Sequence, residues 1–115
     1  MTAVKTSSTN QENKQRILND CPVTLTLEKI GGRWKPLILF NLREGMRRYG
    51  QLRKSIPGIT EKMLVQHLRE LEADKLVLRL VKPVVPPHVE YSLTARGVSL
   101  VPLLNEMARW GLSQK

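Results

Sequence analysis

The stretch VKPVVPPHVEY, residues 81–91, constrains the fold more than any other part of the chain. It places three prolines within five positions, between two segments rich in valine. Because proline has no amide hydrogen, it belongs in turns and at sheet edges and is excluded from a central strand. The stretch therefore predicts two short antiparallel strands joined by a stiff, exposed tip that carries Lys82 and His88.

Helical patterns precede this hairpin. Residues 22–32 begin with proline, carry apolar residues at helical spacing and end in two glycines, which predicts a first helix. Residues 33–45 predict a second helix, and its unbroken apolar run Leu37–Phe40 indicates that it is buried on most sides. Met46–Tyr49 then predicts a very short strand.

Two closely spaced helices follow. Leu52 and Ile56 lie four residues apart, as on one face of a short helix, and Pro57-Gly58 predicts a turn. Thr60 is suited to cap the amphipathic stretch up to Lys75. At about 100° per residue, leucines line one side of this stretch and polar residues the other. The expected buried set is Leu64, Leu68 and Leu71, and the expected outward set is Lys62, Gln66, Arg69 and Ala73.

After the hairpin, Thr94 is suited to cap a last helix over residues 95–111, which Pro102 should bend. The predicted order of elements is mainly α with a small antiparallel β-hairpin, an α+β winged helix-turn-helix. In that fold the second of the two paired helices enters the DNA major groove. The hairpin is then the wing, where Lys82 and His88 offer donors to phosphate and proline prevents pairing with other strands.

The charge distribution favours a polyanionic partner. The chain has a net charge of +9, with 19 lysines and arginines against 10 acids. Six basic residues and one acid lie between Met46 and Arg69, whereas the next five residues contain three acids. A solvated helix face, the alternative interpretation, usually mixes its signs, so the basic segment is assigned to nucleic acid.

Several other classes of function are disfavoured. One cysteine excludes an intrachain disulfide and fits a reducing compartment. No signal-peptide-like or membrane-spanning run is present, so we expect a cytoplasmic protein. The two histidines lack further metal ligands at suitable spacing, and no nucleophile–base pair or phosphate loop is present. We therefore expect no metal, no cofactor and no enzyme activity. We also expect residues 1–12 to form a flexible polar arm and residues 13–115 to form the domain.

Three segments together resemble the HxlR-type transcriptional regulators, small bacterial winged-helix proteins related to the MarR group. They are residues 21–45, 47–72 and 86–97, with the motifs cysteine-proline, glycine-glycine-basic-tryptophan, lysine-methionine-leucine and proline-proline-x-valine-glutamate-tyrosine. The resemblance implies a dimeric repressor that binds a palindromic operator. It also implies that the terminal helices form the dimer contact and that the helix over residues 60–74 reads bases.

The sequence departs from the family pattern at two positions. Lys75 stands where the family usually has glycine just after the recognition helix. A left-handed backbone costs lysine more than glycine, so this corner should be strained or differently shaped. His88 stands in the wing where arginine is common, which makes the wing charge dependent on pH.

The candidate functional residues fall into three sets. Those assigned to DNA contact are Thr60, Lys62, Gln66 and Arg69 on the recognition helix, Arg47, Arg48 and Lys54 as phosphate clamps, and Lys82 and His88 in the wing. Those assigned to the homodimer are Leu103, Leu104, Met107 and Trp110. The third set is Cys21 alone.

Fold alone does not determine function, so a second function stays open. It is a winged-helix module for RNA or protein contact without gene control.

Cys21 is the candidate sensor. Relatives that this sequence resembles sense quinones, aldehydes or oxidants through a cysteine at the matching cysteine-proline position. Cys21 precedes Pro22 and so lies beside a helix N-terminus, where the helix dipole favours thiolate, whereas the neighbouring Asp20 opposes it. The expected partner is a small electrophile or thiol that forms an adduct there. The alternative is a buried cysteine that acts as a small hydrophobe.

Overall fold

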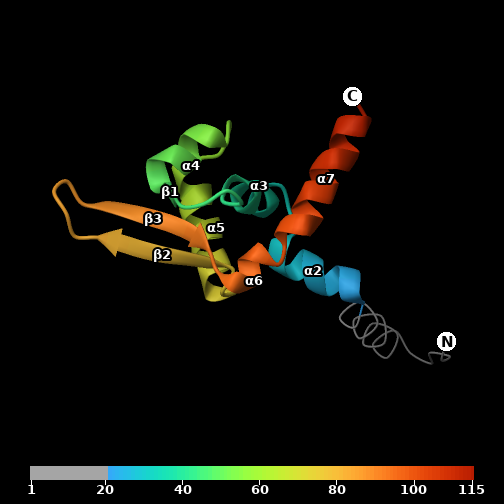
Figure 1. Ribbon diagram of the computed structural model, residues 1–115, viewed down its shortest axis with the longest axis horizontal. Helices are drawn as coiled ribbons and strands as arrows, with labels where there is room; N and C mark the ends of the chain where they lie inside the picture. Colours follow the sequence, from blue (N-terminus) through green and yellow to red (C-terminus); the bar gives the residue numbers. More distant parts are fainter. Residues whose placement is uncertain (1–20) are drawn as a thin grey trace, which may run out of the picture. The chain divides into compact units, whose positions relative to one another are not determined.

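The computed structural model describes residues 21–115, which belong to two compact units that divide after Gly31 (Figure 1). The described part of the first unit is helix α2 (Pro22–Ile30), which begins with proline, as predicted, and whose C-cap is Gly31. The predicted polar arm, residues 1–12, lies outside the described residues. The division of the chain into residues 1–12 and 13–115 therefore stays a prediction.

The second unit holds the remaining elements, and their order confirms the predicted fold class (Figure 1). The helices are α3 (Trp34–Asn41), α4 (Tyr49–Ser55), α5 (Glu61–Ala73), α6 (Ala95–Val98) and α7 (Val101–Ser113). The strands are β1 (Arg47–Arg48), β2 (Val77–Lys82) and β3 (His88–Leu93). Among residues 21–115 no helix is long and apolar enough to cross a membrane.

The sheet has three antiparallel strands in the order β1-β3-β2. The predicted hairpin is confirmed, since β2 and β3 pair continuously from Val77↔Leu93 to Lys82↔His88. Pairing of β1 with β3, through Arg47↔Tyr91, was not predicted. The predicted strand Met46–Tyr49 is also shorter than expected, because Tyr49 already begins α4.

The core of the second unit is aliphatic apart from Tyr91 and draws on nearly every element. The leucines predicted to line the inner side of α5 are fully buried, which confirms that part of the helical pattern. Helix α3 contributes Ile38 and Leu39, but Leu37 is 40% exposed, so this helix is buried on fewer sides than its apolar run predicts. The packing of α5 against α3 and β2 fixes the direction of its outer face.

The C-terminal segment forms two helices, and the prediction of one helix bent at Pro102 is wrong. Helix α6 ends at Val98, and Pro102 lies in the first turn of α7. Amide hydrogens of a first turn have no partner within the helix, so proline starts α7 at no cost in hydrogen bonds. Gly97 lets α6 approach the backbone just before β2 closely, because a Cβ there would lie 2.2 Å from the carbonyl oxygen of Leu76.

The sequence predicts that the corner at Lys75 is either strained or differently shaped, and the structure has the left-handed conformation there. Lys75 has a φ of 60°, and it is the only residue other than glycine with positive φ among those described. The amide of Lys75 donates to the Glu72 carbonyl at 2.9 Å, and that of Leu76 donates to the Leu71 carbonyl at 3.0 Å. These two bonds close the C-terminus of α5 in the motif that normally uses glycine.

Replacing Lys75 with glycine should stabilise the protein. The left-handed conformation costs an L-residue about 1–2 kcal/mol, and glycine loses about 0.5–1 kcal/mol more backbone entropy on folding. We therefore expect Lys75→Gly to raise the free energy of unfolding by about 0.5–1 kcal/mol in urea denaturation. Lys75→Ala is the control, because it keeps the Cβ and should gain nothing; an unchanged or lower value for Lys75→Gly would show that the corner is not strained.

Candidate nucleic-acid interface

Helices α4 and α5 are joined by a tight turn that sets the direction of α5. Leu52 and Ile56 anchor α4 in the core, and the turn passes through Gly58, whose φ is 86°. The amide of Met63 donates to Thr60 Oγ1 at 3.1 Å, so Thr60 caps the N-terminus of α5 as predicted. This arrangement is a helix-turn-helix with α5 as its second helix.

The outer face of α5 carries the side chains that the helical period assigns to it. Lys62, Gln66 and Arg69 are exposed, whereas the leucines on the opposite side are buried. This pattern gives the second helix two hydrogen-bonding cations and an amide on a surface free of core contacts. Lysine, arginine and glutamine are residue types that read base edges in a major groove.

Gln66 is tied to a network that the sequence analysis missed. Its Nε2 donates to Glu70 Oε2 at 3.3 Å, and Glu70 Oε1 accepts from Lys35 Nζ on α3 at 2.7 Å. Hydrogen bonds from Lys35 and then from Gln66 hold the pKa of the Glu70 carboxyl below its usual value. The spacing of Gln66 and Glu70, four residues apart on a helix, was available from sequence, but the contact with Lys35 was not.

The two predicted wing donors share one carboxylate, that of Glu90. His88 Nε2 lies 2.9 Å from Glu90 Oε2, and Lys82 Nζ lies 4.0 Å from Glu90 Oε1. His88 and Glu90 are two apart on β3 and so share a face of the sheet, on which the register also places Lys82. The Lys82 charge is therefore partly neutralised within the protein, and His88 already has a polar partner there, which the sequence did not predict.

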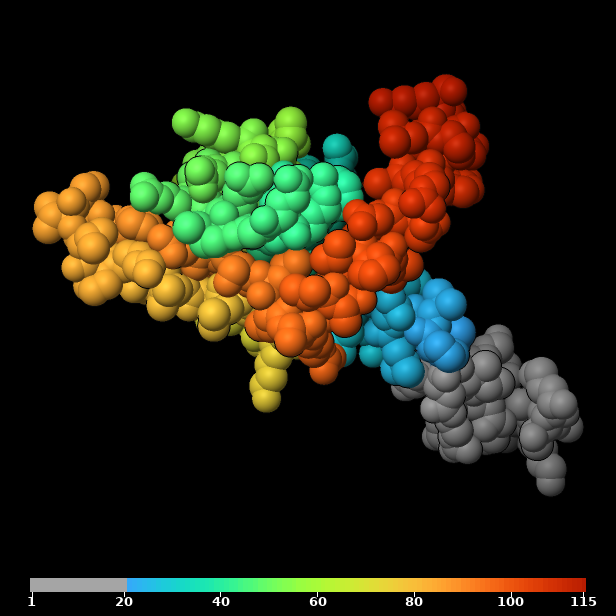
Figure 2. All heavy atoms as spheres, in the orientation of Figure 1, coloured from blue at the N-terminus to red at the C-terminus, as the bar shows by residue number. Residues whose placement is uncertain are grey.

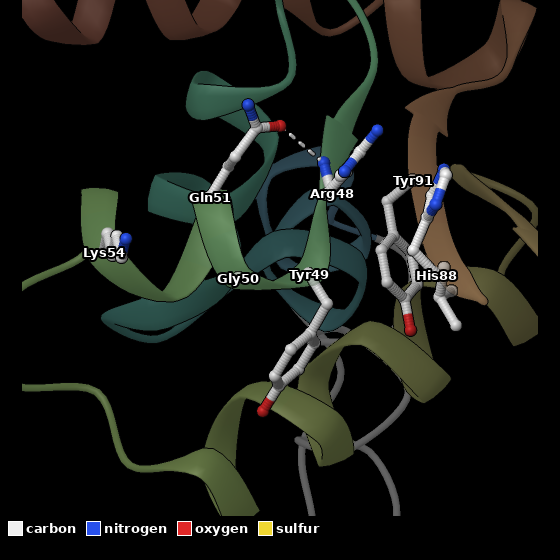
Figure 3. A pocket seen from close by; sticks show the side chains of 8 residues that line it. Arg48, Tyr49, Gly50, Gln51, Lys54, His88 and Tyr91 are labelled. Carbon is white, nitrogen blue, oxygen red and sulfur yellow. Dashed lines mark hydrogen bonds between the residues drawn. The ribbon is translucent and has the colours of Figure 1, made fainter. Parts of the chain in front are cut away.

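A hollow of about 510 Å³ lies between β3 and the start of α4, and we refer to it as the β3–α4 hollow (Figure 3). Its lining includes Arg48, Lys54 and His88, so three of the predicted phosphate contacts border one depression. Its wall includes Tyr49, whose burial raises the pKa of its phenol. Figure 3 shows Arg48 at the start of α4 and Lys54 farther along this helix, whereas His88 and Tyr91 line the β3 side of the hollow.

Arg47 does not join this group. Its Nε lies 3.5 Å from the carbonyl oxygen of Asn41, and its side chain is half-buried. Arg48, the next residue of β1, is exposed, and its backbone amide donates to Gln51 Oε1 at 2.8 Å (Figure 3). Adjacent strand residues point to opposite faces, so only one of the two arginines can extend toward a ligand at this hollow.

The wing and α7 extend in different directions from the body of the second unit (Figure 2). On α7, Leu103, Met107 and Trp110 are 41%, 47% and 69% exposed and form a stripe at helical spacing. Leu104 is only 3% exposed, so its assignment to a dimer surface is corrected: it belongs to the core of a single copy. The period of a helix cannot separate positions 103 and 104 when both are leucine.

Cys21 is the N-cap residue of α2 and carries a free, half-buried thiol. Hydrogen bonding from the backbone amide of Thr24, then from that of Val23, lowers the pKa of this thiol below its ordinary value of 9.0. The sequence left open whether the pKa of the Cys21 thiol is raised or lowered, and the lowered pKa favours the thiolate. Cys21 is partly buried, whereas the alternative interpretation expects a fully buried side chain. Within residues 21–115 no three histidine, cysteine or acidic side chains are grouped to hold a metal ion.

Comparisons with known proteins agree with this geometry. Residues 29–115 match the model of the HxlR-like helix-turn-helix family. An uncharacterized HTH-type transcriptional regulator of Bacillus subtilis (strain 168), YkvN, is 52% identical over 91 residues, which are 79% of this chain and 77% of that one. The redox regulator HypR in its oxidized form superimposes with a TM-score of 0.80 and 46% identity, over 83% of this chain and 98% of that one. The reduced form of the transcriptional regulator YodB from B. subtilis gives a TM-score of 0.68 and 37% identity, over 78% and 89%.

Proposed function

The chain belongs to the HxlR-like family of helix-turn-helix transcriptional regulators, and from this premise we propose that it represses transcription as a homodimer bound to a palindromic operator. The observation that carries the proposal is the outer face of α5, which exposes Lys62, Gln66 and Arg69 on a helix capped by Thr60. In the major groove these side chains would reach base edges.

Phosphate contacts would fix the position of the helix on the duplex. Arg48 and Lys54 border the β3–α4 hollow beside α4, and both are exposed. Contacts of this kind set register and orientation but carry no sequence information. In the wing, Lys82 and His88 would contact phosphate in competition with Glu90, so they contribute less than two free cations.

The palindrome follows from the proposed dimer. Two copies related by a twofold axis present two α5 helices in opposite directions, so each reads the same half-site on opposite strands. The stripe Leu103, Met107 and Trp110 on α7 supplies an apolar surface for the contact between copies. Helix α2 adds exposed apolar side chains, those of Val23 and Leu27 among them.

Selection of bound sequences from a random duplex pool tests this function. We expect enrichment of an inverted repeat whose half-sites lie about 10 base pairs apart, centre to centre, or a multiple of that spacing. Enrichment of no duplex sequence would contradict the proposal. Preferential binding of single-stranded RNA by a monomer would instead support the RNA-contact module.

We further propose that Cys21 makes DNA binding sensitive to electrophiles and oxidants. The position of its thiol at the N-terminus of α2 favours the thiolate, which is the reactive form. As the sole cysteine of the chain, it would form an adduct, a mixed disulfide with a small thiol, or a bridge to the Cys21 of the second copy. The structural similarity to the redox regulator HypR supports this proposal.

Diamide or a quinone should release DNA from the unmodified protein and not from Cys21→Ser. Because the pKa of the thiol is lowered, its alkylation rate should fall as pH drops through a value below 9.0, with the thiolate present above it. The measurement is fluorescence anisotropy of a labelled duplex before and after treatment. Equal release from both proteins, or release from neither, would make Cys21 a structural residue.

A further inference from the structure

We propose that Glu70 is a positioning residue that orients the side-chain amide of Gln66, so that α5 presents the carbonyl oxygen and the second N–H of that amide to the DNA in a fixed order and selects adenine at that position. This inference rests on the proposed function, because it concerns how α5 reads a duplex. Glu70 itself would not touch the bases. It would act through Gln66, with Lys35 as its anchor.

Lys35 can hold the Glu70 carboxylate in place because the Lys35 side chain is nearly buried. Its side chain is 12% exposed and comes from α3, which packs against α5 in the core. The Lys35 Nζ to Glu70 Oε1 distance of 2.7 Å is that of a charge-assisted hydrogen bond. His67 Nδ1 lies 3.8 Å from the same oxygen and adds a second neighbour. Glu70 is therefore held from the side of α3, and its other oxygen faces Gln66.

The chemistry of a carboxylate determines which end of the Gln66 amide it binds. An ionised carboxylate can only accept hydrogen bonds, so Gln66 must offer its NH₂ group. The structure shows this orientation, because Gln66 Nε2 donates to Glu70 Oε2 at 3.3 Å. The lowered pKa of Glu70 keeps this carboxyl ionised at neutral pH. The NH₂ group has two hydrogens and gives one to Glu70, so the carbonyl oxygen Oε1 and the second N–H of Gln66 are left for an external partner.

An acceptor and a donor held in a fixed order discriminate among the bases in a major groove. Adenine presents its N6 amino group there beside the acceptor N7, whereas guanine and thymine present only acceptors and the thymine methyl. With its amide oriented by Glu70, Gln66 should accept from N6 and donate its second N–H to N7. A freely turning amide could instead direct its NH₂ group at the acceptors of guanine, which would weaken the preference for adenine.

Base analogues test this on the unmodified protein. Parallel selections with the wild type and Gln66→Ala first identify the base pair whose preference depends on Gln66, and we expect adenine there. Purine, which lacks the amino group, should weaken binding by about fivefold to tenfold. 7-Deazaadenine, which keeps the amino group and lacks N7, should weaken binding by a similar factor.

Glu70→Gln tests the positioning role. Its amide can donate as well as accept, so it no longer dictates the orientation of Gln66, and we expect the preference at this one base pair to fall by about fivefold. Glu72→Gln is the matched control, because it removes the same charge from an exposed site on α5. Thermal unfolding of Glu70→Gln checks the fold, and Lys35→Met/Glu70→Gln replaces it if the unpaired Lys35 destabilises the protein.

The outcomes separate this inference from the proposed function. Guanine, thymine or cytosine at the Gln66-dependent position would overturn the inference and leave duplex reading intact. So would an affinity unchanged by 7-deazaadenine, or an unchanged preference in folded Glu70→Gln. Enrichment of no duplex by the wild type would overturn the proposed function, and this inference with it.

Discussion

Raising the salt concentration from 50 to 200 mM should weaken duplex binding by about 10³ to 10⁵, the loss expected when roughly six to ten phosphate contacts release their counterions. Exposed cations beside α4 and on α5 include Arg48, Lys54, Lys62 and Arg69, whereas Arg53, also exposed on α4, lies 3.6 Å from a carboxylate oxygen of Glu61. Two copies of this set fall within that range even if the wing contributes little. The measurement is anisotropy of a labelled duplex over a salt series.

Two substitutions show whether the salt dependence arises from the proposed DNA surface: one lies on that surface and the other lies away from it. Arg48→Gln removes one phosphate contact per subunit and should reduce the slope of log K against log salt by about 2 for the dimer. Arg109→Gln removes the same charge from α7, where Arg109 pairs with Glu106, and should leave the slope unchanged. A slope that falls equally in both variants would mean that the net charge of the protein, and not this surface, governs binding.

Trp110→Glu should convert a dimer into monomers at micromolar concentration. Trp110 is 69% exposed in a single copy, although burying such a side chain is worth about 25 cal/mol per Å² of apolar surface. Losing an aromatic anchor from an interface typically costs about 2–4 kcal/mol, or roughly 30- to 1,000-fold in the dimer dissociation constant. Sedimentation velocity measures the change.

The control for this prediction lies on the same helix. Leu112 is 66% exposed and lies about 200° around α7 from Trp110, so Leu112→Glu should leave the dimer intact. Deletion of α7 is unsuitable, because Leu104 belongs to the core and α7 packs against α3. If Trp110→Glu remains dimeric, the contact between copies lies elsewhere on the chain.

Local signals explain why much of the fold could be predicted from sequence. The leucine spacing of α5 and the Thr60 cap act within one or two helical turns, and both are confirmed. The prolines of residues 83–87 are confirmed as the exposed tip between β2 and β3 for the same reason. Even the left-handed Lys75 follows locally, since a helix that closes in this motif needs positive φ at that position.

The parts that could not be predicted depend on contacts between distant residues. Pairing of β1 with β3 joins Arg47 to Tyr91, and the network around Gln66 requires Lys35 from another helix. The burial of Leu104 depends on tertiary packing, which the helical period of α7 alone does not reveal. Pro102 was misjudged for a different reason: proline is compatible both with a bend and with a first turn, and sequence alone does not choose between them.

The specificity ratio tests the central claim, that α5 reads bases in a duplex, most directly. It is the affinity for the enriched inverted repeat divided by that for random duplex of equal length, measured by competition at one salt concentration. We predict a ratio of at least about 10³ for the wild type. Gln66→Ala should lower the affinity for the repeat by about 1–3 kcal/mol and leave that for random duplex almost unchanged. A ratio near one, or equal losses on both DNAs in Gln66→Ala, would contradict base reading by this helix.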